Sequence, residues 1–366
     1  MMFRLLIVLL LLLLSACTPE AALLRKMEES SALMERWLTN NVKEKGIFRY
    51  TRNTATGEEP STNNPIRQLM AARLLAELAT EHPELLALHR KNLAFYLRYW
   101  YRETEDGPGY VFYDDSSKLG SNALLLRTFV ASPDFPQHAE KAAKVAQGIF
   151  SLMDAQGALR PWFIEPDRAT DHDYLLTFYS GEALLALFEY AAKTGDASVL
   201  ARAIQSQEYY IRRYVAQMET HYYPAYVPWH TMSIYHLWER TGDDRYADAI
   251  FALNDKLLEL LDRTEYVGRF YNPLTPQYGS PHSSSDGVYT EGLAYALDTA
   301  IRMQDATRMA RYTDALTLAV TNLMNLQITN GQDTGAIRIR ADNDWIRIDT
   351  VQHALDAFRK ARTVLH

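Results

Sequence analysis

Residues 157–196 read GALRPWFIEPDRATDHDYLLTFYSGEALLALFEYAAKTGD, and this stretch sets the pattern for the rest of the chain. A glycine leads a short apolar strand at 157–163, and a polar loop follows at 165–174. The run 180–192 is apolar on nearly every face, which is typical of a buried helix. Gly195 suits the left-handed residue that follows the end of such a helix. The stretch is therefore interpreted as a module of strand, loop, buried helix and turn.

The module recurs in degenerate form along the chain, with a period of roughly 45–60 residues. Each copy pairs an apolar helix with an amphipathic one. The predicted apolar helices are 64–79, 119–130, 180–192, 229–240, 289–303 and 349–363. The predicted amphipathic helices are 21–41, 85–100, 137–153, 199–218, 246–261 and 308–326.

This alternation, with strands too short to build a sheet, predicts an all-α closed ring of six inner helices surrounded by six outer ones. The chain begins on an outer helix and ends on an inner helix, which leaves no helix unpaired. An open solenoid of helical hairpins is the alternative, and it would need polar capping helices at both ends. The final helix, 349–363, has little of the polar character of a cap.

The composition excludes several classes of function. With 366 residues, 48% of them hydrophobic and 23% charged, the chain has the make-up of an ordinary globular protein. The net charge is −7 and no basic stripe is present, which argues against nucleic acid as a partner. The sequence also lacks a phosphate-binding loop, a serine nucleophile elbow and a zinc-binding helix motif. We therefore predict no cofactor and no metal.

The start of the chain resembles a bacterial lipoprotein signal. An unbroken apolar run at 5–14 is too short to span a bilayer, and it leads into LSAC at 14–17, which is similar to a lipobox. This resemblance implies that Cys17 carries palmitate and anchors the protein to a membrane in the cell envelope. Thr18 follows in place of aspartate, which favours the outer membrane in a Gram-negative host. An uncleaved signal anchor is the alternative.

The mature chain as a whole resembles the (α/α)6 toroids, which comprise six-hairpin glycosidases and related uronic-acid epimerases and polysaccharide lyases. The resemblance rests on the sixfold pattern and on the phrases YSGEAL at 179–184 and DGVYTEGL at 286–293. It implies a carbohydrate-active toroid, but no motif selects one enzyme family. The predicted organisation is a signal peptide at 1–16, a lipidated tether at 17–20 and one toroid domain at 21–366.

In such a ring, the N-termini of all six inner helices open at one end, where their unpaired N–H groups suit acidic or hydroxyl-rich ligands. We expect the polar loops to gather carboxylates, aromatic rings and a few cations at this mouth. The predicted catalytic residues are Asp173, Glu182, Asp286 and Glu291. The predicted substrate-binding residues are Asn64, Arg67, Tyr223, Trp229, His230, Tyr289, Arg347 and His353.

Paired carboxylates supply the acid and the base of glycoside hydrolysis. We expect Asp173 or Glu182 to act as the acid, and Asp286 or Glu291 to act as the base. Both glutamates lie within otherwise apolar helices, so their burial predicts raised pKa values. The alternative is structural, because carboxylates at these positions, like that of Asp349, also cap helices or favour their N-terminal ends.

The favoured function is hydrolysis of a polysaccharide or oligosaccharide by an envelope lipoprotein. Epimerisation or β-elimination at a uronic acid is the first alternative. The second is a non-catalytic toroid that binds glycan or holds other envelope proteins together. An enzyme needs two carboxyl groups facing each other across the hollow, whereas a binding protein needs only the aromatic rings.

Overall fold

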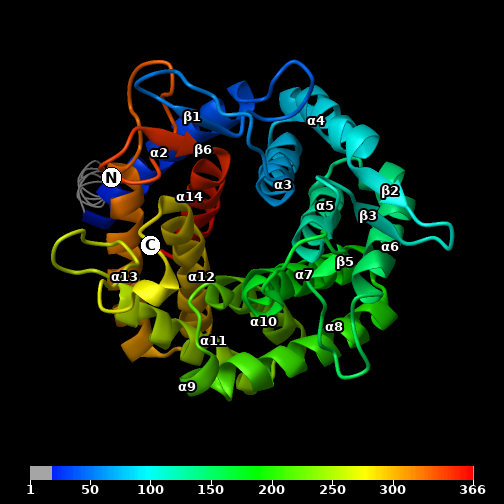
Figure 1. Cartoon of the computed structure of the whole chain (residues 1–366). Helices are drawn as coiled ribbons and strands as arrows, with labels where there is room; N and C mark the ends of the chain where they lie inside the picture. Colours follow the sequence, from blue (N-terminus) through cyan, green and yellow to red (C-terminus); the bar gives the residue numbers. More distant parts are fainter. Residues whose placement is uncertain (1–18, 366) are drawn as a thin grey trace, which may run out of the picture.

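The computed structural model describes residues 19–365, which form a closed all-α ring (Figure 1). The inner helices are α3 (Pro65–Glu81), α5 (Leu119–Ala131), α7 (His172–Thr194), α10 (Tyr226–Thr241), α12 (Ser283–Arg302) and α14 (Ile348–Ala361). The outer helices are α2 (Pro19–Asn40), α4 (Leu86–Tyr99), α6 (Phe135–Phe150), α8 (Ala197–Tyr210), α11 (Asp244–Leu257) and α13 (Ala306–Asn325).

The inner helices contact one another in chain order, and the last of them, α14, packs against the first, α3. The predicted closed ring is therefore confirmed, and the open solenoid is not. No helix within residues 19–365 combines the length and the apolarity needed to cross a bilayer. The predicted signal peptide and Cys17 lie outside the described residues.

Local signals in the sequence fix where the helices begin and end. The Asn64 side chain accepts hydrogen bonds from the N–H groups of Ile66 and Arg67, which caps α3. Gly195 follows α7 with a φ of 73°, in the left-handed region predicted for it. Glycines also allow the inner helices to approach closely: a Cβ at Gly181 of α7 would collide with Trp229 of α10.

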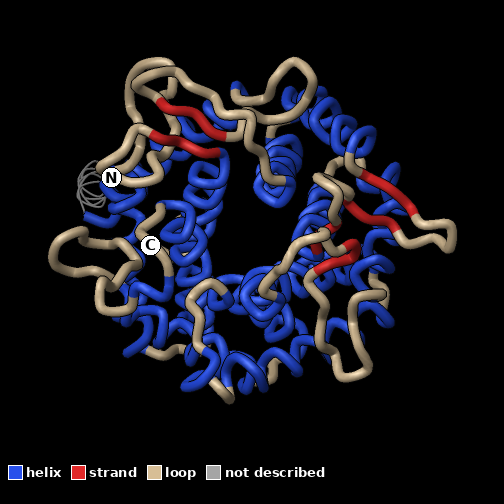
Figure 2. Tube along the Cα trace, in the orientation of Figure 1, coloured by secondary structure: helices blue, strands red, loops and turns tan. Residues whose placement is uncertain are grey.

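Short strand pairs lie among the loops (Figure 2). β1 (Thr51–Asn53) pairs antiparallel with β6 (Trp345–Arg347), so the two ends of the chain are joined by a ribbon as well as by helices. The remaining pairs are β2 (Tyr101–Glu103) with β3 (Gly109–Val111), and β4 (Ser117–Lys118) with β5 (Trp162–Ile164).

In the fourth copy of the module, the run 221–226 holds the place of the strand but forms none in the structure. It ends the short helix α9 (Met218–His221) and then turns directly into α10. Pro224 lies in this run and has no N–H to donate to a strand ladder, which is consistent with the missing strand.

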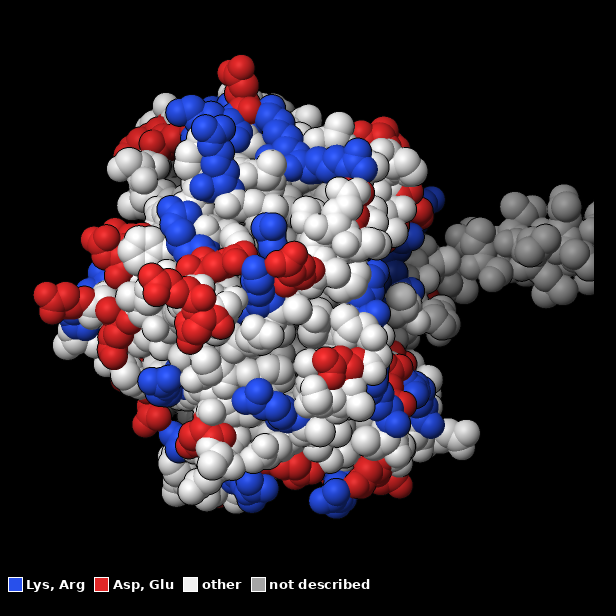
Figure 3. All heavy atoms as spheres, turned by 90° about the vertical axis from the view of Figure 1, so that its right-hand side faces the viewer, with Lys and Arg blue, Asp and Glu red and all other residues white. Residues whose placement is uncertain are grey.

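The outer surface of the ring is exposed to solvent and charged. Figure 3 shows charges of both signs over the side that carries α6, with a basic cluster at its upper edge.

A layer of buried ion pairs joins neighbouring inner helices. Arg73 of α3 binds both carboxylate oxygens of Asp356 of α14, and the Arg73 side chain is only 6% exposed. Arg127 of α5 binds Glu189 of α7 in the same bidentate way, with N–O distances of 2.7 and 2.8 Å. The Arg73–Asp356 pair joins the first inner helix to the last, so electrostatics as well as packing close the ring.

The closing ion pair gives a prediction about stability. Asp356→Asn should lower the free energy of unfolding by about 3–5 kcal/mol, because it leaves the buried Arg73 guanidinium without its main counter-charge. Urea denaturation followed by circular dichroism measures this. Asp314→Asn, which breaks the exposed Arg263–Asp314 pair, is the matched control and should cost less than about 1 kcal/mol. Equal small losses in both variants would contradict the assignment.

Candidate active site

A cavity of about 230 Å³ opens at the end of the ring where the inner helices begin. Five of the six inner helices contribute side chains, mostly from their first turns or from the residue just before them. The cavity is lined by Asn64, Ile66, Arg67, Met70, Tyr174, Leu175, Phe178, Tyr179, Glu182, Ala225, Trp229, Ser284, Ser285, Val288, Tyr289, Asp349 and His353. We call it the central cavity.

Glu182 lies at the wall of the central cavity on α7, and only 2% of the residue is exposed. Gly120 of α5 faces it; a side chain there would fill the space that the carboxyl group occupies. Its Oε2 atom has no hydrogen-bond partner among the described residues. Burial raises the pKa of Glu182 to about 8, although the charge of Arg127 opposes this shift. Glu182 is therefore protonated at neutral pH, as its place in an apolar helix predicted.

Asp349, in the first turn of α14, has the opposite protonation state. Its carboxylate accepts from Arg347 at 2.5 and 2.8 Å and from Arg67 at 2.9 Å. Burial alone would raise its pKa, but the charges of Arg347 and Arg67 outweigh burial and hold the pKa far below its usual range. One cavity thus holds a neutral carboxyl group and an ionised one, the contrast that acid–base enzymes use.

Two histidines lie beside this carboxylate. His353 follows Asp349 by one helical turn, and burial lowers its pKa to about 4, so the ring is neutral at pH 7. Its Nδ1 atom has no partner within residues 19–365, and its ring centre lies 5.8 Å from that of Trp229. His282 is also neutral, because burial lowers its pKa to about 4, and its Nε2 accepts from Arg347 at 2.9 Å.

Aromatic rings form much of the remaining wall. Tyr174, Phe178, Tyr179, Trp229 and Tyr289 all line the cavity. Tyr174 stands at the rim, where it is 45% exposed, and the others are more deeply buried. Aromatic faces in a cavity wall, with nearby hydroxyl and amide groups, are suited to the flat, apolar faces of sugar rings.

Six of the predicted site residues line the central cavity: Asn64, Arg67, Glu182, Trp229, Tyr289 and His353. Arg347 and Tyr223 contribute indirectly. Arg347 holds Asp349 in place, and the Tyr223 ring packs edge-on against Tyr174, with 5.6 Å between their ring centres.

The structure does not bring Asp173 and Asp286 together with Glu182. The Asp173 side chain is 80% exposed and pairs with Arg213 outside the cavity. Asp286 is buried on the side of α12 that faces α13, where it accepts from the Phe270 N–H at 2.9 Å and from Asn322 at 3.3 Å. Asp286 lines a separate side pocket, and burial raises its pKa to about 7.

Glu291 and His230 also lie outside the cavity lining. Glu291 is buried in α12 near the ion-pair layer, where burial and the charge of Asp356 raise its pKa to about 8. His230 is enclosed behind the wall, with one ring nitrogen 3.0 Å from the Ser180 hydroxyl and the other 3.2 Å from Gln207. The expected meeting of Glu182 with a base on α12 is therefore not observed, and Asp349 of α14 is the ionised carboxylate that shares its cavity.

From the sequence, Asp349 is expected at the mouth and is a candidate helix cap, but it is not among the predicted catalytic residues; Tyr174, Phe178, Tyr179, Ser284 and Ser285 are not among the predicted site residues either. In the structure Arg347, not Asp349, is the N-cap residue of α14. One signal was available, because Asp349 and His353 are four residues apart and so share a face of one helix.

Comparison with known proteins shows which solved structures share this fold. No protein-family model matches the chain, and no curated protein sequence does. A solved D-mannose isomerase superposes with a TM-score of 0.70 at 11% identity, covering 92% of this chain and 97% of that one. An unsaturated glucuronyl hydrolase specific for heparin gives a TM-score of 0.68 at 9% identity, with coverages of 93% and 98%.

The GH76A α-1,6-mannanase from Salegentibacter sp. HEL1_6 is similar to the same degree, with a TM-score of 0.68 at 11% identity and coverages of 93% and 100%. At these identities the likeness is one of fold. The chain therefore has the six-hairpin toroid fold that its sequence pattern predicted.

The buried carboxyl of Glu182 predicts how stability changes with pH. Its pKa is about 8 in the folded protein against 4.5 as the ordinary value, so between these pH values the unfolded chain binds fewer protons. Stability then falls as pH rises. Relative to Glu182→Gln, the wild type should lose up to about 1.4 kcal/mol for each pH unit from 4.5 to 8.

Urea unfolding of both proteins at pH 5 and pH 8 measures this difference. The raised pKa values of Asp286 and Glu291 act in both proteins and cancel. Parallel pH profiles would show that Glu182 is ionised in the folded state.

Proposed function

We propose that this protein is a carbohydrate-active enzyme that hydrolyses a glycosidic bond in the central cavity. The observation that carries the proposal is that one cavity holds both a protonated Glu182, whose Oε2 has no partner among residues 19–365, and an ionised Asp349. An acid that holds its proton at neutral pH and a fixed negative charge are both needed when a glycosidic bond breaks.

In this mechanism Glu182 donates its proton to the oxygen of the leaving sugar. The carboxylate of Asp349 stabilises the positive charge that develops on the remaining sugar ring. Asp349 itself is a poor base, because two arginines hold its charge. The neutral His353 on the same helix face is the group that accepts a proton from the attacking water. Asn64, Ser284 and Ser285 provide hydrogen bonds for sugar hydroxyl groups.

Epimerisation or β-elimination at a uronic acid is the second candidate, and one observation favours it. A neutral histidine beside an aromatic wall can remove a proton from a sugar carbon, with Glu182 as the opposing acid. Arg67, which lines the cavity and whose side chain is 33% exposed, would then bind the sugar carboxylate. Product analysis separates the two, since hydrolysis yields new reducing ends and elimination yields an absorbing double bond.

The structural neighbours support sugar chemistry at the level of the fold. Those described above are an isomerase and hydrolases of sugars, and an inactive variant of the mannanase has been solved with α-1,6-mannotriose. A non-catalytic glycan-binding protein is the remaining alternative. It predicts binding without turnover.

The acid role of Glu182 is tested by screening purified protein against neutral and uronic-acid oligosaccharides. On any substrate found, Glu182→Gln should lower kcat about 10²–10⁴-fold, because the leaving oxygen loses its proton donor. Glu140→Gln, on the exposed surface of α6, is the matched control and should keep the wild-type kcat. Turnover that survives in Glu182→Gln would rule out this acid, and binding without any turnover would rule out the enzyme.

We also propose that Cys17 carries a lipid that holds the ring at a membrane of the cell envelope. The outer helix α2 ends near the mouth, where Asn40 lines a pocket with Arg347, whereas Glu28 nearer its start pairs with Arg362 beyond the end of α14, so Pro19 lies toward the opposite end of the ring. A lipid at Cys17 would therefore leave the central cavity facing away from the bilayer.

The anchor can be tested by metabolic labelling with palmitate in a bacterial host. The wild type should incorporate label and sediment with membranes, whereas Cys17→Ser should do neither. Label retained by Cys17→Ser would place the lipid elsewhere, and an unlabelled wild type would remove the lipoprotein assignment.

A further inference from the structure

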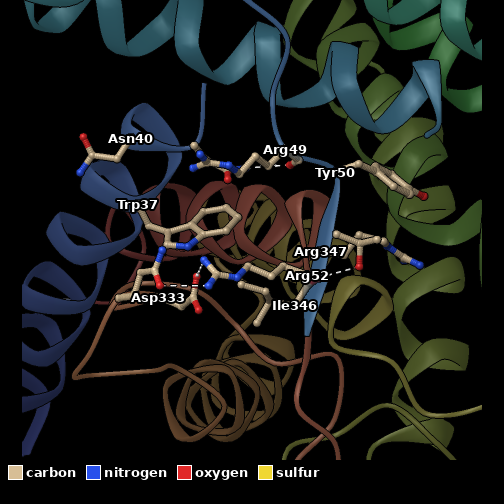
Figure 4. A pocket seen from close by; sticks show the side chains of 11 residues that line it. Trp37, Asn40, Arg49, Tyr50, Arg52, Asp333, Ile346 and Arg347 are labelled. Carbon is tan, nitrogen blue, oxygen red and sulfur yellow. Dashed lines mark hydrogen bonds and ion pairs between the residues drawn. The ribbon is translucent and has the colours of Figure 1, made fainter. Parts of the chain in front are cut away.

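A third pocket, of about 100 Å³, lies between α2 and the β1–β6 ribbon, next to the central cavity (Figure 4). We call it the outer pocket. Its wall includes Trp37, Asn40, Arg49, Arg52, Asp333 and Ile346. By the usual requirement of about 10–15 Å³ for one buried water, this volume has room for several waters or a small polar ligand.

The ribbon separates the outer pocket from the central cavity, yet two residues of the outer pocket, Tyr50 and Arg347, bond to residues that line the central cavity. Figure 4 shows Trp37 and Arg52 on one side of β1, with Tyr50 and the guanidinium of Arg347 on the other. Tyr50 accepts a hydrogen bond from Arg67 of the central cavity, and Arg347 binds Asp349 there. Through these two contacts the outer pocket adjoins residues that line the central cavity, with the ribbon between the two.

The charges in the outer pocket are balanced. Arg52 lies 3.5 Å from Asp333, Arg49 lies 3.3 Å from Glu59, and Arg347 is held by Asp349. Every arginine in the wall thus has a carboxylate partner, which disfavours an anionic ligand. Neutral hydroxyl groups fit better, because each can donate to a carboxylate and accept from the neighbouring guanidinium.

Unused hydrogen-bonding capacity remains in this wall. Within the part of the chain that the structure describes, the buried Nε atom of Arg52 has no hydrogen-bond partner, and its other nitrogens bond to Gln332 at 3.0 Å and to Asp333. Asn40 is exposed at the end of α2. Trp37 and Ile346 supply an apolar surface next to these polar groups. Planar polar groups beside an aromatic ring are the features that hold a sugar residue.

We propose that the outer pocket binds a neutral sugar residue of an oligosaccharide whose other end occupies the central cavity. The inference rests on the proposed function for its substrate class. The enzyme should then prefer oligosaccharides of several residues, because a monosaccharide occupies only the central cavity and makes no contact with the outer pocket.

The test measures binding by isothermal titration calorimetry. It uses the Glu182→Gln variant, because this variant should not hydrolyse the oligosaccharides during the titration. The probes are α-1,6-mannotetraose, cellotetraose, tetragalacturonate and the corresponding monosaccharides. A neutral tetrasaccharide should bind, and adding Arg52→Gln should weaken it about tenfold, the loss of one or two hydrogen bonds to a charged group. The affinity for the monosaccharide should not change.

Two further variants keep the test clear of folding effects. Asn40→Ala changes only an exposed residue of the outer pocket and should weaken the tetrasaccharide several-fold. Arg36→Gln removes an exposed arginine of α2 that does not line the pocket, so it should leave binding unchanged. Unchanged affinity in both Arg52→Gln and Asn40→Ala, tighter binding of tetragalacturonate, or no binding of any probe would overturn the inference.

These outcomes differ from a failure of the proposed function. If wild-type protein turns over short substrates but neither pocket variant alters KM for longer chains, only the outer pocket is wrong. If no glycan is turned over but tetrasaccharide binding depends on Arg52, the outer pocket stands as a binding site and the enzyme assignment is wrong.

Discussion

The ion pair between Arg73 and Asp356 meets a requirement that any ring of helices has. Inner helices that surround an axis bring side chains from several directions to one place, and polar groups there are cut off from water. Each buried charge then needs a partner, because an uncompensated one is strongly destabilising. Arg73 with Asp356, and Arg127 with Glu189, satisfy this need across two of the helix interfaces. Glu182, close to the same layer, is bonded to no arginine or lysine among residues 19–365 and keeps its proton instead.

The same burial produces opposite results at two carboxyl groups. Glu182 faces apolar and aromatic neighbours, so the cheapest state is the neutral one. Asp349 is equally buried, yet two guanidinium groups reach it and its charge is retained. The difference depends on Arg67 and Arg347, which come from opposite ends of the chain. The chemistry of the central cavity is therefore a property of the closed ring and is present in no single module.

Hydrophobic pattern was sufficient to predict the ring but not the whole site. The alternation of apolar and amphipathic helices predicted the inner and outer layers. Gly195 was the predicted left-handed residue after the end of α7, and the structure has it there. The inner helices, however, are apolar all round, so their sequences do not say which face points to the axis. Glu182 and His230 both lie in such helices, and only Glu182 faces the cavity. Asp286 turned outward for the same reason, and Asp349 gained its role from arginines that no local pattern could place beside it.

Ring closure also governs how this chain must acquire its structure during synthesis. The β1 strand pairs with β6, and α3 packs against α14. The segments near residues 50 and 73 therefore cannot form these contacts until the segments near residues 347 and 356 have been synthesised. Until the ribosome has released the last helix, the apolar flanks of α3 and α12 have nothing to cover them. Contacts of such long sequence separation form slowly. A nascent or shortened chain would thus be a target for chaperones and proteases, and only the finished polypeptide would escape them.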